Sequence, residues 1–107
     1  IVTGGENVYS VEVENALASQ PAVDEVAVFG LPAPTRGEAV HAVVVATGPV
    51  TEAELITHCR QHIAGFKVPK SIEIQDGALP KSAAGKILKR ELRSPFWADQ
   101  TSQVSGS

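Results

Sequence analysis

The sequence predicts an α+β fold: a small sheet of about three strands flanked by helices, with an N-terminal β-hairpin. Three observations lead to it. Strand-like and helix-like segments alternate along the chain, two of the strand candidates are apolar on both faces, and 107 residues allow one core but not comfortably two. A hydrophobic content of 43% with 20% charged residues is typical of globular proteins and excludes wholesale disorder.

The first twenty residues predict a hairpin followed by a helix. Residues 1–3 read as a short strand, residues 4–7 (GGEN) as a turn, and residues 8–9 as the returning segment. Residues 10–20 carry apolar side chains four apart and acidic residues near their start, which favours a helix, and Pro21 ends it.

The middle of the chain predicts two buried strands and a second helix. Residues 23–29 are apolar on both faces, so we expect a central strand that breaks at residues 30–32 (GLP). Residues 39–46 show the same apolar pattern, so we expect a second buried strand there. The second helix begins at Thr51 as N-cap, with Glu54 completing a capping box, and Gly65 closes it.

The last part predicts a third strand at residues 71–75 and a short helix at residues 86–93 that Pro95 stops. We expect a domain over residues 1–94 and a disordered, mostly polar tail over residues 95–107. The chain contains no methionine, so we expect it to be a piece of a longer protein. No apolar run approaches the length of a transmembrane segment.

Charge is distributed unevenly between the two halves. Residues 1–59 carry a net charge of −7 and residues 60–93 one of +5, within a total of −3. This balance, with a pI near 5.5, argues against a nucleic-acid partner. A positive half favours a compact anion such as a nucleotide, and a solvated surface is the alternative.

Lys86 is the residue with the strongest chemical context. The segment SAAGK at residues 82–86 lacks the first glycine and the final hydroxyl of a Walker A loop. It predicts a lysine on a flexible loop beside Gly85, at the start of the last helix. Such an ammonium suits a phosphate or carboxylate, and an ordinary surface lysine is the alternative.

The other candidates have simpler structural interpretations. His58 and His62 have the spacing of a two-histidine metal site but no third ligand, so we expect no metal site. Cys59 lies on the apolar stripe of the second helix, so we expect a core residue and not a nucleophile. The single cysteine excludes an intramolecular disulfide and fits a reducing compartment, and we expect His41 to be a partnered sheet residue.

Three segments together resemble a known family. Residues 4–14 (GGENVYSVEVE) resemble the GGENVYPxEVE motif that opens the C-terminal domain of acyl-CoA synthetases in the adenylate-forming superfamily. Residues 66–69 (FKVP) are similar to its aromatic-Lys-x-Pro segment, and residues 79–93 (LPKSAAGKILKRELR) to its closing PKTxxGKIxRxxLR motif. Ser10 replaces the usual proline, and serine is tolerated at a helix start. Ser82 replaces a common threonine, which is a conservative change.

The resemblance implies an acid–thiol ligase, expected to act on fatty acids in the cytoplasm. Such enzymes use ATP to form an acyl-adenylate and then a thioester with coenzyme A. A large N-terminal adenylation domain, absent here, would hold ATP, acid and most of the Mg²⁺ contacts. Lys86, supported by Gly85, is implied to be catalytic in adenylation, and the turn Gly4-Gly5-Glu6 to face the pantetheine arm of CoA in a second pose of the mobile domain.

Two other functions remain open from the sequence. In the first, the same domain delivers the acyl group to a carrier protein's phosphopantetheine. In the second, the basic residues 81–93 form a non-catalytic module that binds an anionic partner.

Overall fold

Five strands and three α-helices build an α+β structure in the part of the chain described by this computed structural model, residues 1–35 and 37–106, with side chains to Trp97. The predicted fold class is confirmed, with the N-terminal hairpin counted in a five-stranded sheet. The elements are β1 (Val2–Thr3), β2 (Glu6–Asn7), α1 (Ser10–Ala18), β3 (Val23–Ala33), β4 (Gly37–Ala46), α2 (Glu52–Arg60), the 3-10 helix η1 (Gly65–Lys67), β5 (Ser71–Gln75) and α3 (Lys89–Gly106).

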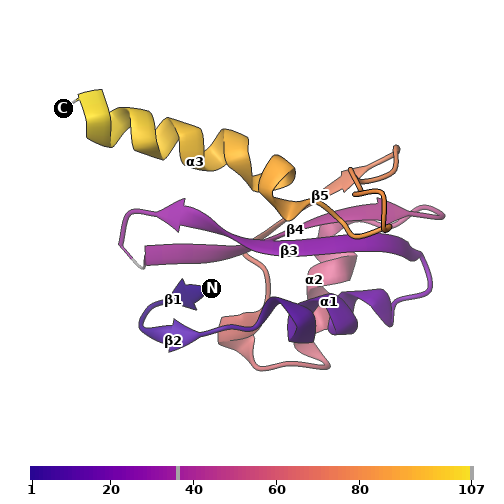
Figure 1. Cartoon of the computed structure of the whole chain (residues 1–107). Coiled ribbons are helices and arrows are strands. Elements are labelled where there is room, and N and C mark those ends of the chain that lie inside the picture. The colour runs from indigo at the N-terminus through magenta and orange to yellow at the C-terminus, as the bar shows by residue number, and fades with distance from the viewer. Residues whose placement is uncertain (36, 107) are drawn as a thin grey trace.

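Strand β4 is the centre of the sheet. It pairs with β3 along its whole length in antiparallel register. Its other side pairs with β1 at one end, through Thr3 and Gly37, and with β5 in parallel over residues 41–45. Helices α1 and α2 cover one face of the sheet and α3 covers the other (Figure 1).

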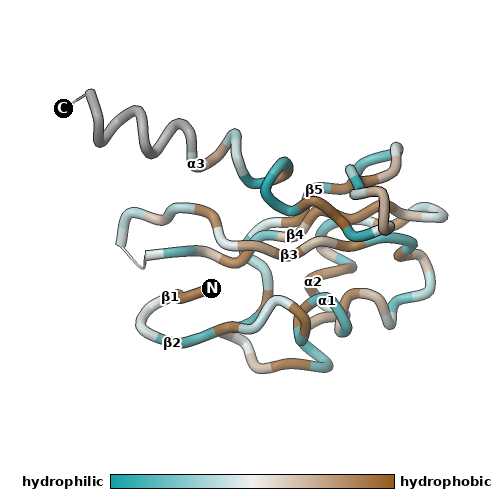
Figure 2. The backbone as a smooth tube through the Cα atoms, viewed as in Figure 1, coloured by the Kyte–Doolittle hydropathy of each residue, from teal (hydrophilic) through white to brown (hydrophobic). Residues whose placement is uncertain are grey.

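Each face of the sheet has its own apolar cluster. Brown, hydrophobic segments run along β3 and β4 in Figure 2, as expected for strands covered on both sides. The smaller cluster, on the face of α3, consists of Ala27, Phe29, Val43, Val45 and Leu79. The larger cluster lies between the sheet and helices α1 and α2: Val8, Val13, Ala16, Leu17, Val28, Val40, Ala42, Val44, Leu55, Cys59, Val68 and Ile72.

The prediction that the strand beginning at Val23 is central is wrong. Strand β3 lies at the edge of the sheet, where β4 is its one partner strand among the described residues. It is apolar on both faces because α1 packs on one side and α3 on the other, so burial by helices mimics the pattern of a central strand.

The predicted break at residues 30–32 is also wrong, because β3 continues through Pro32 to Ala33. On an edge strand alternate residues turn their backbone groups away from the ladder. The N–H of Val28 donates to a carboxylate and the C=O of Gly30 accepts from Trp97, so both point outward. Pro32 shares their parity and therefore removes no hydrogen bond from the ladder.

The predicted end of the last helix at Pro95 is wrong. Helix α3 starts later than predicted, at Lys89, and continues through Pro95 to Gly106. Contacts with β3 hold the turn after the proline: the indole N–H of Trp97 donates to Gly30 O at 2.8 Å, and the rings of Phe96 and Phe29 lie 6.4 Å apart. Tertiary packing here overrides the local signal of proline.

Two local predictions near the other helices are confirmed. Helix α1 begins at Ser10 as predicted and ends two residues earlier, at Ala18. Thr51 caps α2: its side chain accepts from the Glu54 N–H at 3.1 Å, and Glu54 accepts from the Thr51 N–H at 2.9 Å. Within the described residues no helix is both long enough and apolar enough to cross a membrane.

Candidate functional site

Lys86 lies on a small hairpin and not at a helix start. Lys81 and Ile87 form an antiparallel bridge, the Ser82 N–H donates to Lys86 O at 2.8 Å, and the Leu88 N–H donates to Pro80 O at 2.8 Å. Gly85 closes the turn with φ +86°, a conformation that side chains disfavour. The expectation of a helix beginning at Lys86 is therefore corrected, and we call residues 80–88 the lysine hairpin.

The Lys86 side chain is exposed, and no carboxylate of the described residues forms an ion pair with it. The lysine hairpin borders a groove of about 740 Å³ that Glu14, Val26 and Lys89 also line. An exposed ammonium beside an open groove is available to an anion brought by another part of the protein.

The glycine turn, residues 4–6, contains a β-turn whose two-residue loop is Gly4-Gly5. Thr3 pairs with Glu6, and the two glycines between them both have positive φ, +57° and +82°. This is the geometry of a type I′ turn, so the returning strand is Glu6–Asn7 and not residues 8–9 as predicted. The turn borders a pocket of about 340 Å³ that Phe66 and Lys70 also line.

The two loops lie at opposite ends of the β3–β4 ladder. The glycine turn follows Thr3, which pairs with Gly37 at the start of β4. The lysine hairpin contacts Glu25, which pairs with Val45 near the end of β4. The structure thus does not bring Lys86 together with Gly4, Gly5 and Glu6, and each loop presents its own surface.

In the part of the chain with described side chains, three ion pairs join the acidic half to the basic half. Lys67 pairs with Glu12, Lys81 with Glu25 and Lys89 with Glu14, at 2.5 to 2.9 Å. Part of the positive charge of residues 60–93 is therefore neutralised within the fold. Sequence reasoning missed Glu25 as the partner of Lys81 in the lysine hairpin and Glu14 as the partner of Lys89 just after it. The paired residues are 56 and 75 positions apart, and no local pattern connects them.

The remaining candidates are structural. Cys59 is fully buried in the larger cluster, as predicted, and burial raises the pKa of its thiol to about 11. The Nε2 atom of His58 lies 2.7 Å from Ser19 Oγ, and among the described residues no group of three potential metal ligands occurs.

His41 has the partner predicted for it, since its Nδ1 atom lies 2.7 Å from Ser71 Oγ. Its Nε2 atom is buried without a hydrogen-bond partner in the described part of the chain, against the rings of Phe29 and Phe96. Burial lowers the pKa of the imidazole from its usual 6.5, and the charges of Glu73 and Glu52 oppose this effect.

Comparison with known proteins gives one consistent result. The sequence model of the family "AMP-binding enzyme C-terminal domain" matches residues 12–86. A long-chain-fatty-acid–CoA ligase of Escherichia coli is 49% identical over 94 residues, which are 87% of this chain and 17% of that protein. A feruloyl-CoA synthase of an Amycolatopsis species is 49% identical over 98 residues, 90% of this chain and 20% of that protein.

The fold agrees with solved structures of the same kind. The Mycobacterium tuberculosis fatty acyl CoA synthetase superposes with a TM-score of 0.85 at 41% identity, over 92% of this chain and 20% of the other. The chain therefore spans about a fifth of the length of the proteins that it matches.

Proposed function

The chain belongs to the family of AMP-binding enzyme C-terminal domains, and on that premise we propose that it is the mobile C-terminal domain of an ATP-dependent acid–CoA ligase. The strongest support is the family match over residues 12–86, together with relatives that are named a CoA ligase and a CoA synthase. An N-terminal adenylation domain in the same protein would be its partner, and acid, ATP and CoA its substrates.

In the first step, Lys86 acts on the adenylation reaction. The carboxylate oxygen of the acid attacks the α-phosphorus of ATP, and pyrophosphate leaves. The Lys86 ammonium has no competing carboxylate among the described residues, so it is available to both anions and offsets their charge as they approach. Its role is electrostatic and positional, with Gly85 shaping the hairpin that presents it.

In the second step, the glycine turn faces the pantetheine arm. The CoA thiolate attacks the acyl carbon, and AMP leaves. Apart from the adjoining residues, no heavy atom of the described part of the chain lies within 4 Å of where a Cβ would stand on Gly4 or Gly5, so the backbone there can approach a thin chain closely. This turn and Lys86 lie at opposite ends of the β3–β4 ladder, which supports the proposal that the domain reorients between the two steps.

The Mg²⁺ that accompanies ATP would be held mainly by the N-terminal domain. The described residues contain no cluster of three His, Cys, Asp or Glu side chains that could hold it here. We propose a fatty acid as the substrate and the cytoplasm as the location of the enzyme.

The alternative function, a basic module that docks an anionic partner, is weakened by two ion pairs. Glu25 and Glu14 neutralise Lys81 and Lys89 within the fold.

The test uses the full-length enzyme. Fatty acids and hydroxycinnamic acids are each offered with ATP and with either CoA or a holo-carrier protein, and the acylated product is identified by mass spectrometry. We expect acyl-CoA, AMP and pyrophosphate from a fatty acid, and nearly no turnover by the 107-residue chain alone. Acylation of the carrier instead of CoA would overturn the proposed acceptor, and no adenylation of any acid would overturn the function.

A further inference from the structure

The lysine hairpin is too small to be ordered by its own contacts. Its strands meet at a single bridged pair, Lys81 and Ile87, and an isolated two-stranded hairpin is at best marginally stable in water. Two apolar residues attach it to the smaller cluster: Leu79, the buried residue just before the hairpin, and Ile87 within it. Fixing the direction in which Lys86 points therefore requires directional bonds to the sheet.

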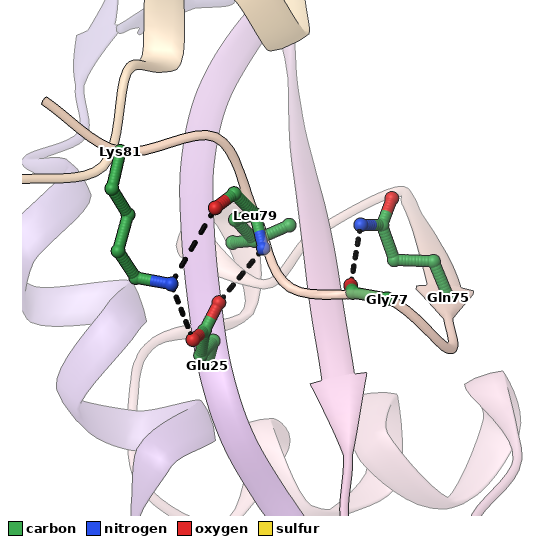
Figure 3. A network of polar contacts seen from close by, with 5 residues as sticks. All are labelled: Glu25, Gln75, Gly77, Leu79 and Lys81. Atoms are coloured by element: carbon green, nitrogen blue, oxygen red, sulfur yellow. Dashed lines mark hydrogen bonds and ion pairs between the residues drawn. The ribbon is translucent and has the colours of Figure 1, made fainter.

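Glu25 of β3 supplies such bonds at the base of the first hairpin strand. One carboxylate oxygen accepts from the Leu79 N–H at 2.9 Å, and the other accepts from Lys81 Nζ (Figure 3). Lys81 is the residue that pairs across the hairpin with Ile87, the neighbour of Lys86. A single carboxylate thus bonds to both the backbone and the side chain of the segment that leads to the catalytic lysine.

A β-bulge aims Glu25 at the hairpin. Val23 pairs with Ala46 and Glu25 with Val45, so Asp24 is an extra residue in β3. Val23 packs against the larger cluster under α1 and α2, whereas Ala27 belongs to the cluster under α3. The extra residue allows Val23 to face one side and Glu25, two positions before Ala27, to face the other, as bulges beside functional sites commonly do.

A second carboxylate holds the far end of the hairpin. Glu14 of α1 accepts from the Val28 N–H at 2.9 Å and pairs with Lys89 at 2.7 Å. Lys89 is the first residue of α3 and follows directly after the hairpin, and its ammonium also donates to Ser10 Oγ at 3.1 Å. Both ends of the hairpin are therefore tied to elements from the first third of the chain.

From this geometry we infer that Glu25 is a positioning residue for adenylation: through Leu79 and Lys81 it holds the lysine hairpin so that Lys86 reaches the reacting groups. The inference rests on the function proposed above. Glu14 performs the same task at the Lys89 end. Both carboxylates bond to other groups of the chain, and in this inference each acts on adenylation by holding the hairpin that carries Lys86.

The experiment separates the two half-reactions in the full-length enzyme. ATP–pyrophosphate exchange reports adenylation, and CoA acylation from supplied acyl-adenylate reports thioester formation. Glu25→Met removes both bonds and should lower exchange by up to about a hundredfold, the loss that a misplacement of about 1 Å can cause. Glu25→Gln keeps an acceptor for the Leu79 N–H and should lower exchange less. Acylation should be unchanged in both.

Glu12→Gln is the matched control. Glu12 makes the same kind of ion pair across the chain, with Lys67 at 2.9 Å, but does not contact the hairpin. We expect normal exchange from this variant. Should Glu25→Met fail to fold, as judged by thermal denaturation, the Glu25→Gln variant decides.

A double-mutant cycle distinguishes positioning from general stabilisation. In a Lys86→Ala background, Glu25→Gln and Glu25→Met should cause no further loss of exchange, because the group they position is absent. An additional loss in that background, or equal losses in exchange and acylation, would overturn the inference. If Lys86→Ala reduces exchange while the Glu25 variants retain it, this inference alone fails. If Lys86→Ala itself leaves exchange intact, the proposed function fails first.

Discussion

Replacing Gly85 by alanine isolates the contribution of one backbone angle to the order of the lysine hairpin. Gly85 has φ +86°, and apart from the adjoining residues no heavy atom of the described part of the chain lies within 4 Å of the position that a Cβ would take. The new methyl group therefore meets no neighbour, and the whole cost comes from the left-handed backbone conformation. That cost is about 1–2 kcal/mol for a residue with a side chain.

This energy should appear as local opening of the hairpin. The Ser82 N–H donates to Lys86 O and the Leu88 N–H to Pro80 O, so both amides are protected only while the hairpin is closed. A loss of 1–2 kcal/mol should lower their protection against hydrogen exchange by about 5- to 30-fold. The Leu55 amide of α2, which donates to Thr51 O, should keep its protection.

Gly48→Ala is the matched control for this measurement. A Cβ at Gly48 would likewise have no atom within 4 Å, but Gly48 does not have a positive φ. This substitution should leave hairpin protection unchanged and stabilise the fold by about 0.4–1 kcal/mol through the unfolded state. Unchanged protection in Gly85→Ala, or an equal loss in both variants, would refute the assignment of the cost to φ.

Three further predictions concern the fold around the site. Cys59, with a thiol pKa of about 11, should resist iodoacetamide at pH 8 in the folded chain and react readily in denaturant; equal rates would contradict its burial. Burial lowers the pKa of His41 below 6.5, so as the pH falls through 6.5 the histidine is protonated first in the unfolded state. The free energy of unfolding should therefore decrease between pH 7 and pH 5.5, and His41→Leu should remove this decrease. Urea denaturation at the two pH values measures it. Thr51→Ala should lower the free energy of unfolding, measured by urea denaturation, by about 1 kcal/mol. Thr57→Ala on the exposed side of the same helix should leave it unchanged, and equal losses in the two variants would argue against the capping box.

Local patterns in the sequence were sufficient for the elements whose signals are local. The capping box at Thr51 and Glu54 depends on residues three apart, and the start of α1 at Ser10 follows a hairpin that two glycines define. Lys86, Gly4, Gly5 and Glu6 could be proposed as site residues because they lie within contiguous motifs. For such features the interacting residues are neighbours in the chain, so the pattern itself contains the contact.

What the sequence could not predict depends on distant contacts. Helix α3 continues past Pro95 because Trp97 bonds to Gly30, 67 positions away. Strand β3 looks central because helices cover both of its faces, which no local pattern distinguishes from burial within a sheet. No local pattern in the sequence connects Glu25 with Leu79, 54 positions away, and the two meet only in the folded chain.

ATP–pyrophosphate exchange by the full-length enzyme, with Lys86 intact and with Lys86→Ala, decides whether Lys86 acts in adenylation. CoA acylation from supplied acyl-adenylate is measured on the same two proteins. We predict that exchange falls by about a hundredfold or more, at least ~2.7 kcal/mol of transition-state stabilisation, while acylation is preserved. That result would assign Lys86 to adenylation and leave thioester formation to the surface of the glycine turn. Exchange that is unchanged in Lys86→Ala would contradict the account and favour a binding role for the domain.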